Sequence, residues 1–131
     1  MLLLPLLALT GCTLGPEELI VGRWKVERAV EQLTVTDGGM TESEMPGYEH
    51  QVVEFMEGDV CMMTDRGDTV YYFWSLQDGA TLVLFREGWA EDYSVDRLDK
   101  ERLVYSDSYT YTDTLTGRKS VYRYIYEHKK L

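Results

Sequence analysis

From residue 50 onward the chain alternates short apolar or aromatic runs with turn-forming sequences at nearly regular spacing. The runs are rich in Val, Tyr, Phe and Trp, which favour β-strands, and Asp, Glu and Gly dominate the stretches between them. Short connections between consecutive strands place those strands side by side in antiparallel pairs. This pattern constrains the fold more than any other feature, and it predicts an antiparallel meander with little helix.

The predicted strands lie at residues 21–30, 50–57, 60–64, 69–76, 80–85, 91–98, 102–114 and 119–128. An antiparallel sheet of this size must protect its edge strands, and closure into a barrel removes the edges. We therefore expect an all-β fold, an antiparallel up-and-down barrel of about eight strands, with a short helical turn at "PEEL" before it. A barrel with this number of strands holds its own side chains or one small ligand.

One predicted connection is long, namely residues 31–49 between the first two strands. Pro46 limits any helix in it to about one turn. Loops of this length in a compact domain are usually functional lids or disordered. The sequence thus predicts a lid over one end of the barrel.

The length of the chain indicates the number of domains, and its net charge limits the classes of partner. The chain has 131 residues, which suits a single domain, and its net charge is −10 with a pI near 4.6. An acidic domain is repelled by nucleic acid, so a nucleic-acid partner is disfavoured. The acidic residues are scattered along the sequence, as on a solvated surface. No feature of the sequence fixes the oligomeric state, and a monomer is favoured.

The first residues, "MLLLPLLALTGCT", form an apolar run that ends in small residues, which is typical of a secretory signal. The run is too short to span a bilayer as a helix. Its last four residues, Leu9 to Cys12, resemble the lipobox of bacterial lipoproteins. The alternative is an ordinary apolar strand or helix.

The lipobox resemblance implies cleavage before Cys12, so that residues 1–11 are a signal peptide and residues 12–131 are the barrel domain. It also implies that Cys12 carries the acyl chains that hold the protein on a membrane of the cell envelope. Thr13 stands where enterobacterial lipoproteins retained at the inner membrane have Asp. This difference favours the outer membrane.

Gly22-Arg23-Trp24 opens the first predicted strand, directly after the helical turn. With the meander and the lipobox, this motif resembles the lipocalin fold over residues 16–128, and in particular the small lipocalin-like lipoproteins of Bacteroidetes-type bacteria. The resemblance implies that Gly22 lets the turn cross the barrel floor and that Trp24 plugs it. It further implies that a C-terminal arginine, Arg123 or alternatively Arg118, stacks across Trp24.

Side-chain alternation places a set of apolar residues inside the barrel. They line a ligand cavity or simply fill the core, and the pattern leaves both open. Trp89, in "REGWAED", is expected in a loop, where it contacts a ligand or partner or packs under the lid. The candidate lining residues are Phe55, Tyr72, Trp74, Leu84, Tyr93 and Val95.

Signals for catalysis are sparse. The two histidines, His50 and His128, lack the spacing of metal ligands and adjoin no nucleophile, so both are expected on the surface. Cys61 lies among apolar neighbours and is expected to be a buried, inert thiol. Arg66-Gly67-Asp68 matches an adhesion tripeptide but is ordinary turn chemistry. No enzyme activity, cofactor or metal is predicted.

The sequence therefore predicts a lipid-anchored, exported barrel that binds a small apolar or amphipathic molecule in its mouth. The alternative is a filled barrel that acts as a protein- or glycan-interaction module. A cavity with a few polar groups distinguishes the first, and a packed interior with an exposed aromatic patch distinguishes the second.

Overall fold

The computed structural model describes residues 14–131, which fold into nine strands and one short helix. Cys12 and the predicted signal peptide lie outside these residues. Helix α2 (Pro16–Ile20) starts with Pro16 and has two acidic residues in its first turn, both of which suit a helix N-terminus. The strands are β1 (Gly22–Val35), β2 (Gly39–Glu44), β3 (Gln51–Phe55), β4 (Val60–Asp65), β5 (Asp68–Gln77), β6 (Thr81–Arg86), β7 (Trp89–Leu98), β8 (Arg102–Thr112) and β9 (Lys119–Lys130).

Eight of the strands form a closed antiparallel barrel. Neighbours run β1, β3, β4, β5, β6, β7, β8 and β9, and the pairing of β9 with β1 closes the ring. β2 is an additional strand on the far side of β1. The predicted fold class, an eight-stranded antiparallel barrel with a short N-terminal helix, is confirmed.

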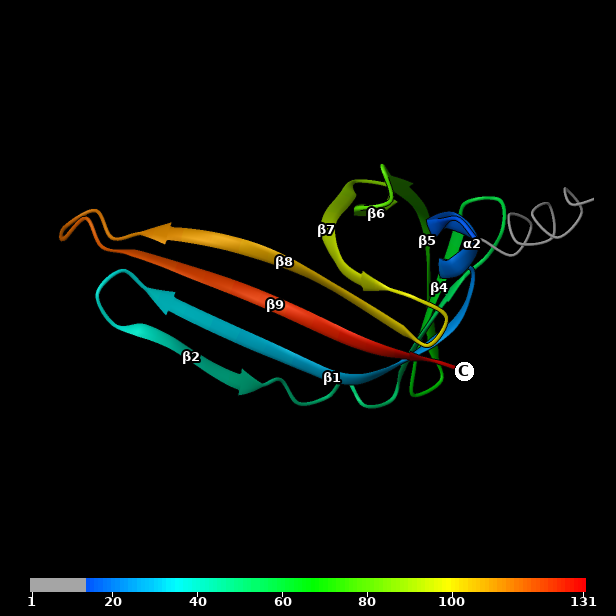
Figure 1. Cartoon of the computed structure of the whole chain (residues 1–131), viewed down its shortest axis with the longest axis horizontal. Coiled ribbons are helices and arrows are strands. Elements are labelled where there is room, and N and C mark those ends of the chain that lie inside the picture. Colours follow the sequence, from blue (N-terminus) through cyan, green and yellow to red (C-terminus); the bar gives the residue numbers. More distant parts are fainter. Residues whose placement is uncertain (1–13) are drawn as a thin grey trace, which may run out of the picture.

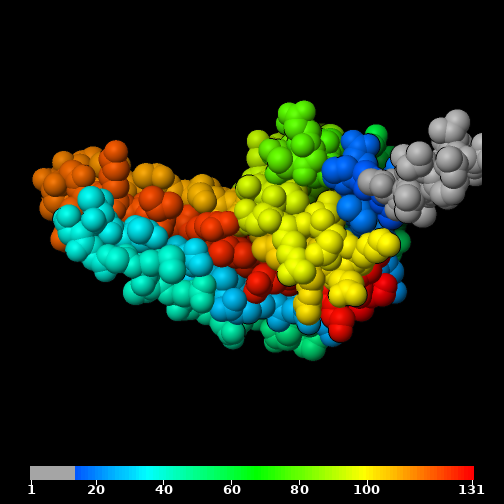
Figure 2. Space-filling view, viewed as in Figure 1, coloured from blue at the N-terminus to red at the C-terminus, as the bar shows by residue number. Residues whose placement is uncertain are grey.

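Three of the barrel strands continue well beyond the barrel. The distal parts of β1, β9 and β8, together with β2, run side by side as a four-stranded sheet that projects to one side (Figure 1). The space-filling view shows the same projection as a narrow extension of the thicker body (Figure 2). We call this sheet the arm, and it comprises residues 30–35, 39–44, 106–112 and 119–125.

The predicted lid over residues 31–49 is wrong. Residues 31–35 extend β1, residues 39–44 form β2, and a turn with Gly39 at φ +76° joins them. The physical reason is local, because Asp37-Gly38 directly after the β-branched residues Thr34 to Thr36 is a hairpin signal. Only residues 45–50 remain as a connector from β2 to β3.

A bulge at Glu27 marks the point where β1 leaves the barrel wall. Residues 22–25 of β1 pair with β3, whereas residues 30–35 pair with β2, and the register against β9 shifts between Val26 and Arg28. An extra residue in one strand bends it and raises its twist. The bulge therefore directs the second half of β1 away from the barrel axis.

The hydrophobic core fills the part of the barrel nearest α2. Trp24 is fully buried, and Phe55 meets Trp74 edge-on with ring centroids 5.5 Å apart. Close packing of such rings excludes water and dominates the burial free energy. The buried cluster comprises Ile20, Trp24, Val53, Phe55, Cys61, Trp74, Leu76, Leu82, Leu84, Leu103 and Tyr105. Within the described residues, no helix is long and apolar enough to cross a bilayer.

Candidate ligand-binding mouth of the barrel

The floor of the barrel is closed by Trp24 and a cation, but the cation is Lys130. The Lys130 ammonium lies 4.5 Å from the centroid of the Trp24 ring and donates a 2.7 Å hydrogen bond to the Val21 carbonyl. Trp24 Nε1 donates to the Ile20 carbonyl at 2.8 Å, which ties the ring to α2. Gly22, at φ +131°, leaves room for the lysine, because a Cβ there would overlap the Lys130 amine.

The predicted pairing of Arg123 with Trp24 is therefore wrong, and so is the alternative, Arg118. Arg123 faces outward at the base of the arm, 3.0 Å from the Asp96 carboxylate, and Ser106 Oγ donates to the same carboxylate at 2.6 Å. Arg118 pairs with Asp37 at the arm tip. Alternation along β9 explains the error, since Tyr126, His128 and Lys130 face inward and Arg123 has the opposite parity.

The predicted lining residues divide into two levels. Phe55, Trp74 and Leu84 are buried in the packed core, so they fill the lower barrel. Tyr72 and Tyr93 are partly buried and pack against the mouth side of that core, whereas Val95, also partly buried, lies toward the α2 end beside the β5–β6 turn. The lower barrel thus resembles the filled alternative, and space for a ligand must be sought above it.

The mouth is the end of the barrel opposite α2, where the arm leaves. The β5–β6 turn is at the α2 end, since a Cβ on Gly79 would touch Pro16, so the β6–β7 turn and Trp89 are at the other end. Trp89 stands against Tyr72 with centroids 5.3 Å apart, and the Arg86 guanidinium lies 5.3 Å from the Tyr72 centroid. Trp89 is 37% exposed. Sequence reasoning had singled out Trp89 and Tyr72, and the structure brings them together.

Two carboxylates that the sequence did not pair also meet at the mouth. Glu91 of β7 and Asp107 of β8 share one phenol, because Tyr109 Oη lies 2.8 Å from Glu91 and 3.2 Å from Asp107. Burial, and next the hydrogen bond with Glu91, raise the pKa of Asp107 to about 6. The hydrogen bond to Glu91 raises the pKa of Tyr109 above its usual range. Only β7–β8 pairing reveals this group, since 16 positions separate the two acids in the sequence.

A chain of tyrosines connects these carboxylates with the core. Tyr93 and Tyr105 contact edge-on at 4.9 Å, and Tyr105 lies 5.6 Å from Tyr126. Tyr48, on the connector between β2 and β3, packs on Tyr126 at 5.5 Å. Burial raises the pKa of Tyr93 and of Tyr126, so both phenols are neutral hydrogen-bonding groups at pH 7.

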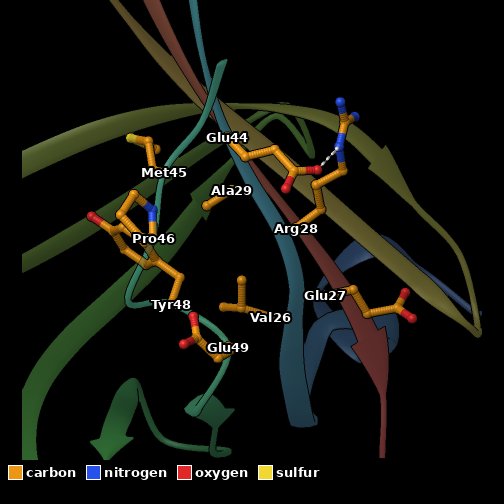
Figure 3. Close-up of a pocket in the computed structure, with 9 residues that line it drawn as sticks. All are labelled: Val26, Glu27, Arg28, Ala29, Glu44, Met45, Pro46, Tyr48 and Glu49. Carbon is orange, nitrogen blue, oxygen red and sulfur yellow. Dashed lines mark ion pairs between the residues drawn. The ribbon is translucent and has the colours of Figure 1, made fainter. Parts of the chain in front are cut away.

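Two hollows open beside this aromatic surface. One, of about 310 Å³, lies inside the rim and is lined by residues of β3, β4 and β5, including Gln51, Met63 and Tyr72. The other, of about 250 Å³, is a slot between β1 and the connector. In Figure 3, Met45, Pro46, Tyr48 and Glu49 of the connector face Val26 and Ala29, while Arg28 points the other way, toward Glu44.

His128 is buried inside the barrel, so its predicted surface position is wrong, whereas His50 is exposed as expected. The ring stacks on Tyr105 at 4.7 Å, and Nδ1 lies 3.1 Å from the Leu103 carbonyl. Burial lowers the pKa of His128 to about 4, so the imidazole is neutral and Nδ1 donates to the carbonyl. Every second residue of β9 faces inward, and this parity placed His128 in the core.

The other residues that the sequence offered for reactive chemistry are parts of the core or of a turn. Cys61 is fully buried, as predicted, and burial raises the pKa of its thiol to about 12, which makes the thiolate inaccessible at neutral pH. Arg66 and Gly67 form the β4–β5 turn, with φ of 51° and 90°. Residues 14–131 contain no cluster of three or more His, Cys, Asp or Glu side chains arranged to hold a metal ion.

Comparison with known proteins assigns the chain to no family. No protein-family model, no curated protein and no solved structure matches the chain significantly.

Proposed function

We propose that this protein is a lipid-anchored, lipocalin-like protein of the cell envelope that binds a small amphipathic molecule at the barrel mouth. Its apolar part packs on Trp89 and Tyr72, and its polar or cationic head lies near Glu91 and Asp107. One observation carries the proposal: Trp89 and Glu91 lie along the inner side of β7, with Tyr72 of β5 and Asp107 of β8 beside them, above the packed core. Convergent polar groups beside apolar surface are typical of ligand sites.

Charge selects the class of ligand. A carboxylate pair next to aromatic faces favours a cation, since aromatic rings and carboxylates both attract positive charge. The chain as a whole carries a net charge of −10, which adds a favourable long-range field for a cationic amphiphile and opposes an anionic one. A long-chain amine is therefore the preferred probe, and the fatty acid of equal length is its matched control.

Titration calorimetry with dodecylamine and with dodecanoate tests the proposal on the full chain. We expect the amine to bind more tightly, and Trp89→Ala to weaken its binding by about 1–2 kcal/mol. Affinity for the amine should fall as the pH drops through about 6, because Asp107 then takes up a proton. Asp107→Asn should bind the amine more weakly at pH 7 and lose this pH dependence.

Native mass spectrometry of the protein from its host provides a second check. A co-purifying small molecule supports the proposal. A bare mass, together with no heat of binding for either probe, contradicts it.

A second candidate, an interaction module, is favoured by a specific observation. The lower barrel is packed, and Tyr71, Phe73 and Phe85 are 61%, 52% and 39% exposed on the outer wall, with the two phenylalanines stacked at 5.6 Å. Aromatic side chains gathered in this way mark contact surfaces. Phe73→Ser with Phe85→Ser should leave dodecylamine binding unchanged if the mouth is the site, and Trp89→Ala should reduce it.

A further inference from the structure

The arm is a single layer of sheet whose two faces differ in character. Strand registers place paired residues on the same face, so residues 33 and 35 of β1 share a face with residues 109 and 111 of β8 and residues 120 and 122 of β9. This inner face continues the inner wall of the barrel, since Tyr105 and Tyr126 have the same parity. Beyond Asp107 its large side chains are Leu33, Val35, Tyr109, Tyr111 and Tyr122.

Beyond the row that holds Glu31 and Asp107, the inner face of the arm carries no charged side chain, whereas the outer face does. The inner rows of the arm consist of Thr41, Leu33, Tyr122 and Tyr109, then Gly39, Val35, Ser120 and Tyr111. The outer face carries Glu42, Glu44, Arg123 and Lys119 on the same strands. A sheet normally buries its apolar face against a second layer, yet Tyr109 and Tyr111 are 52% and 62% exposed here. In a single copy, no second layer therefore covers this part of the inner face.

We infer that the missing layer is the arm of a second copy of this chain, packed face to face about a two-fold axis. Charge supports this occupant, because two copies with a net charge of −10 each repel one another over most of their surface, whereas the inner face beyond the row of Glu31 and Asp107 carries no charge. Two twisted sheets pack well in this way, about 10 Å apart. A two-fold arrangement uses the same patch on both copies and closes at the dimer.

The size of the arm is sufficient for such a contact. Four strands of about six residues cover a flat footprint of about 400 Å² on each copy, from the spacing and rise of β-strands. The two copies together therefore bury about 800 Å² of flat surface. Protruding tyrosines add to this area, which brings the surface buried on both copies near the lower bound of about 1,200 Å² for specific interfaces.

The arm tip supplies a second contact. Leu115, in the β8–β9 turn, is 94% exposed and offers an apolar side chain at the end of the arm. When two antiparallel arms overlap along their full length, each tip reaches the mouth of the other barrel. Leu115 then lies at the edge of the partner's mouth, beside the surface that Trp89 and Tyr72 offer to a ligand.

Edge pairing is the main competing arrangement. β2 is a free edge, but Glu42 and Glu44 lie along it and oppose pairing with the same edge of another copy. The distal part of β8 is also free, because β7 pairs only with residues 103–106 of β8. Substitutions on the two faces of the arm separate face packing from edge pairing.

Site-specific photo-crosslinking in cells tests the inference on the full chain. Tyr122 and Val121 are neighbours on β9 that face opposite sides of the arm, so each is replaced in turn by p-benzoylphenylalanine. Two differently tagged copies are expressed together. We expect Tyr122 to yield a cross-linked band that carries both tags, and Val121 to yield little.

A glutamate substituted on one face or the other of the arm provides the matched control. In the Tyr122 cross-linking background, Val35→Glu should reduce the dimer band by about tenfold or more, since it buries an unpaired charge in the interface, while Thr34→Glu should leave it unchanged. Equal cross-linking from both faces, equal effects of the two glutamates, or a band without the second tag would overturn the inference. Failure of amine binding at the mouth leaves this result unaffected, so the two proposals are tested separately.

Discussion

The barrel and the arm share three strands, yet the same strands behave differently in the two regions. In the barrel, inward residues of β1, β8 and β9, such as Trp24, Leu103 and His128, are fully buried. Farther along β8, Tyr109 and Tyr111 keep that inward parity but are more than half exposed. The difference teaches that alternation alone creates an apolar face, and that burial depends on what lies opposite it.

The two regions also differ in how their polar groups are placed. At the barrel floor, the Lys130 ammonium donates a hydrogen bond to a backbone carbonyl and lies over the indole of Trp24, and burial lowers the pKa of that lysine. The base of the arm is held by partly exposed ion pairs, in which Arg28 contacts Glu42, Glu44 and Glu127. Exposed pairs contribute little each, so the barrel should account for most of the stability.

The largest expected effect contrasts one aromatic residue from each region. Phe55→Ala should lower the free energy of unfolding by about 3–5 kcal/mol, because it opens a cavity in the core. Tyr111→Ala should lower it by less than about 1 kcal/mol when measured at low protein concentration, since that ring is mostly solvated in a single copy. Urea unfolding followed by tryptophan fluorescence measures both, and equal losses would refute the contrast.

Acid should weaken the barrel through His128. Its pKa is lowered to about 4 in the fold from an ordinary value of 6.5, so the unfolded chain binds more protons between these values. Stability from this group is therefore complete above pH 6.5 and is lost as the pH falls toward 4, by about 3 kcal/mol.

His128→Phe keeps the stack on Tyr105 and removes the titrating group. Its stability should vary less between pH 4 and pH 6.5 than that of the wild type, although its stability at pH 7 is lower. Asp107 acts in the opposite direction over part of this range, since its raised pKa makes the fold bind the extra proton. The double variant His128→Phe, Asp107→Asn separates the two contributions.

Gly22→Ala should cost about 1–3 kcal/mol, from a positive φ that alanine rarely adopts and from the displacement of Lys130. A double-mutant cycle with Lys130→Ala separates these causes, because only the backbone cost remains once the lysine is gone. Urea unfolding of the four proteins gives the coupling energy. Strict additivity would mean that Gly22 makes no room for the lysine.

The smallest expected effect is at the junction of the two regions. Asp96→Ala removes the carboxylate that joins Ser106 to Arg123, and the cost should be about 1 kcal/mol because the ion pair is partly exposed. Hydrogen exchange should then accelerate in β8 and β9 of the arm before it changes in β3–β6. Acceleration in all strands alike would show that the junction supports the barrel as a whole.

Local patterns were sufficient for the strands and for the choice between inside and outside. Period-two alternation placed Phe55, Trp74 and Leu84 inside the barrel, the apolar neighbours of Cys61 indicated a buried thiol, and the turn residues between the strands indicated antiparallel neighbours. The hairpin at Asp37-Gly38 was also readable, but the prediction of a lid over residues 31–49 passed over it. His128 had the parity of a buried residue, but it was predicted on the surface because it lacked metal-ligand spacing and adjoined no nucleophile.

The remaining features depend on pairing between strands that are far apart in the sequence. The sequence by itself determined a closed antiparallel barrel with an aromatic interior, since alternation and turn chemistry act between residues close in the chain. Only the tertiary structure placed Lys130 over Trp24, brought Glu91 to Asp107, and left the arm without a second layer. These features depend on the register between strands and on where a bulge redirects one of them, and both result from packing over the whole molecule.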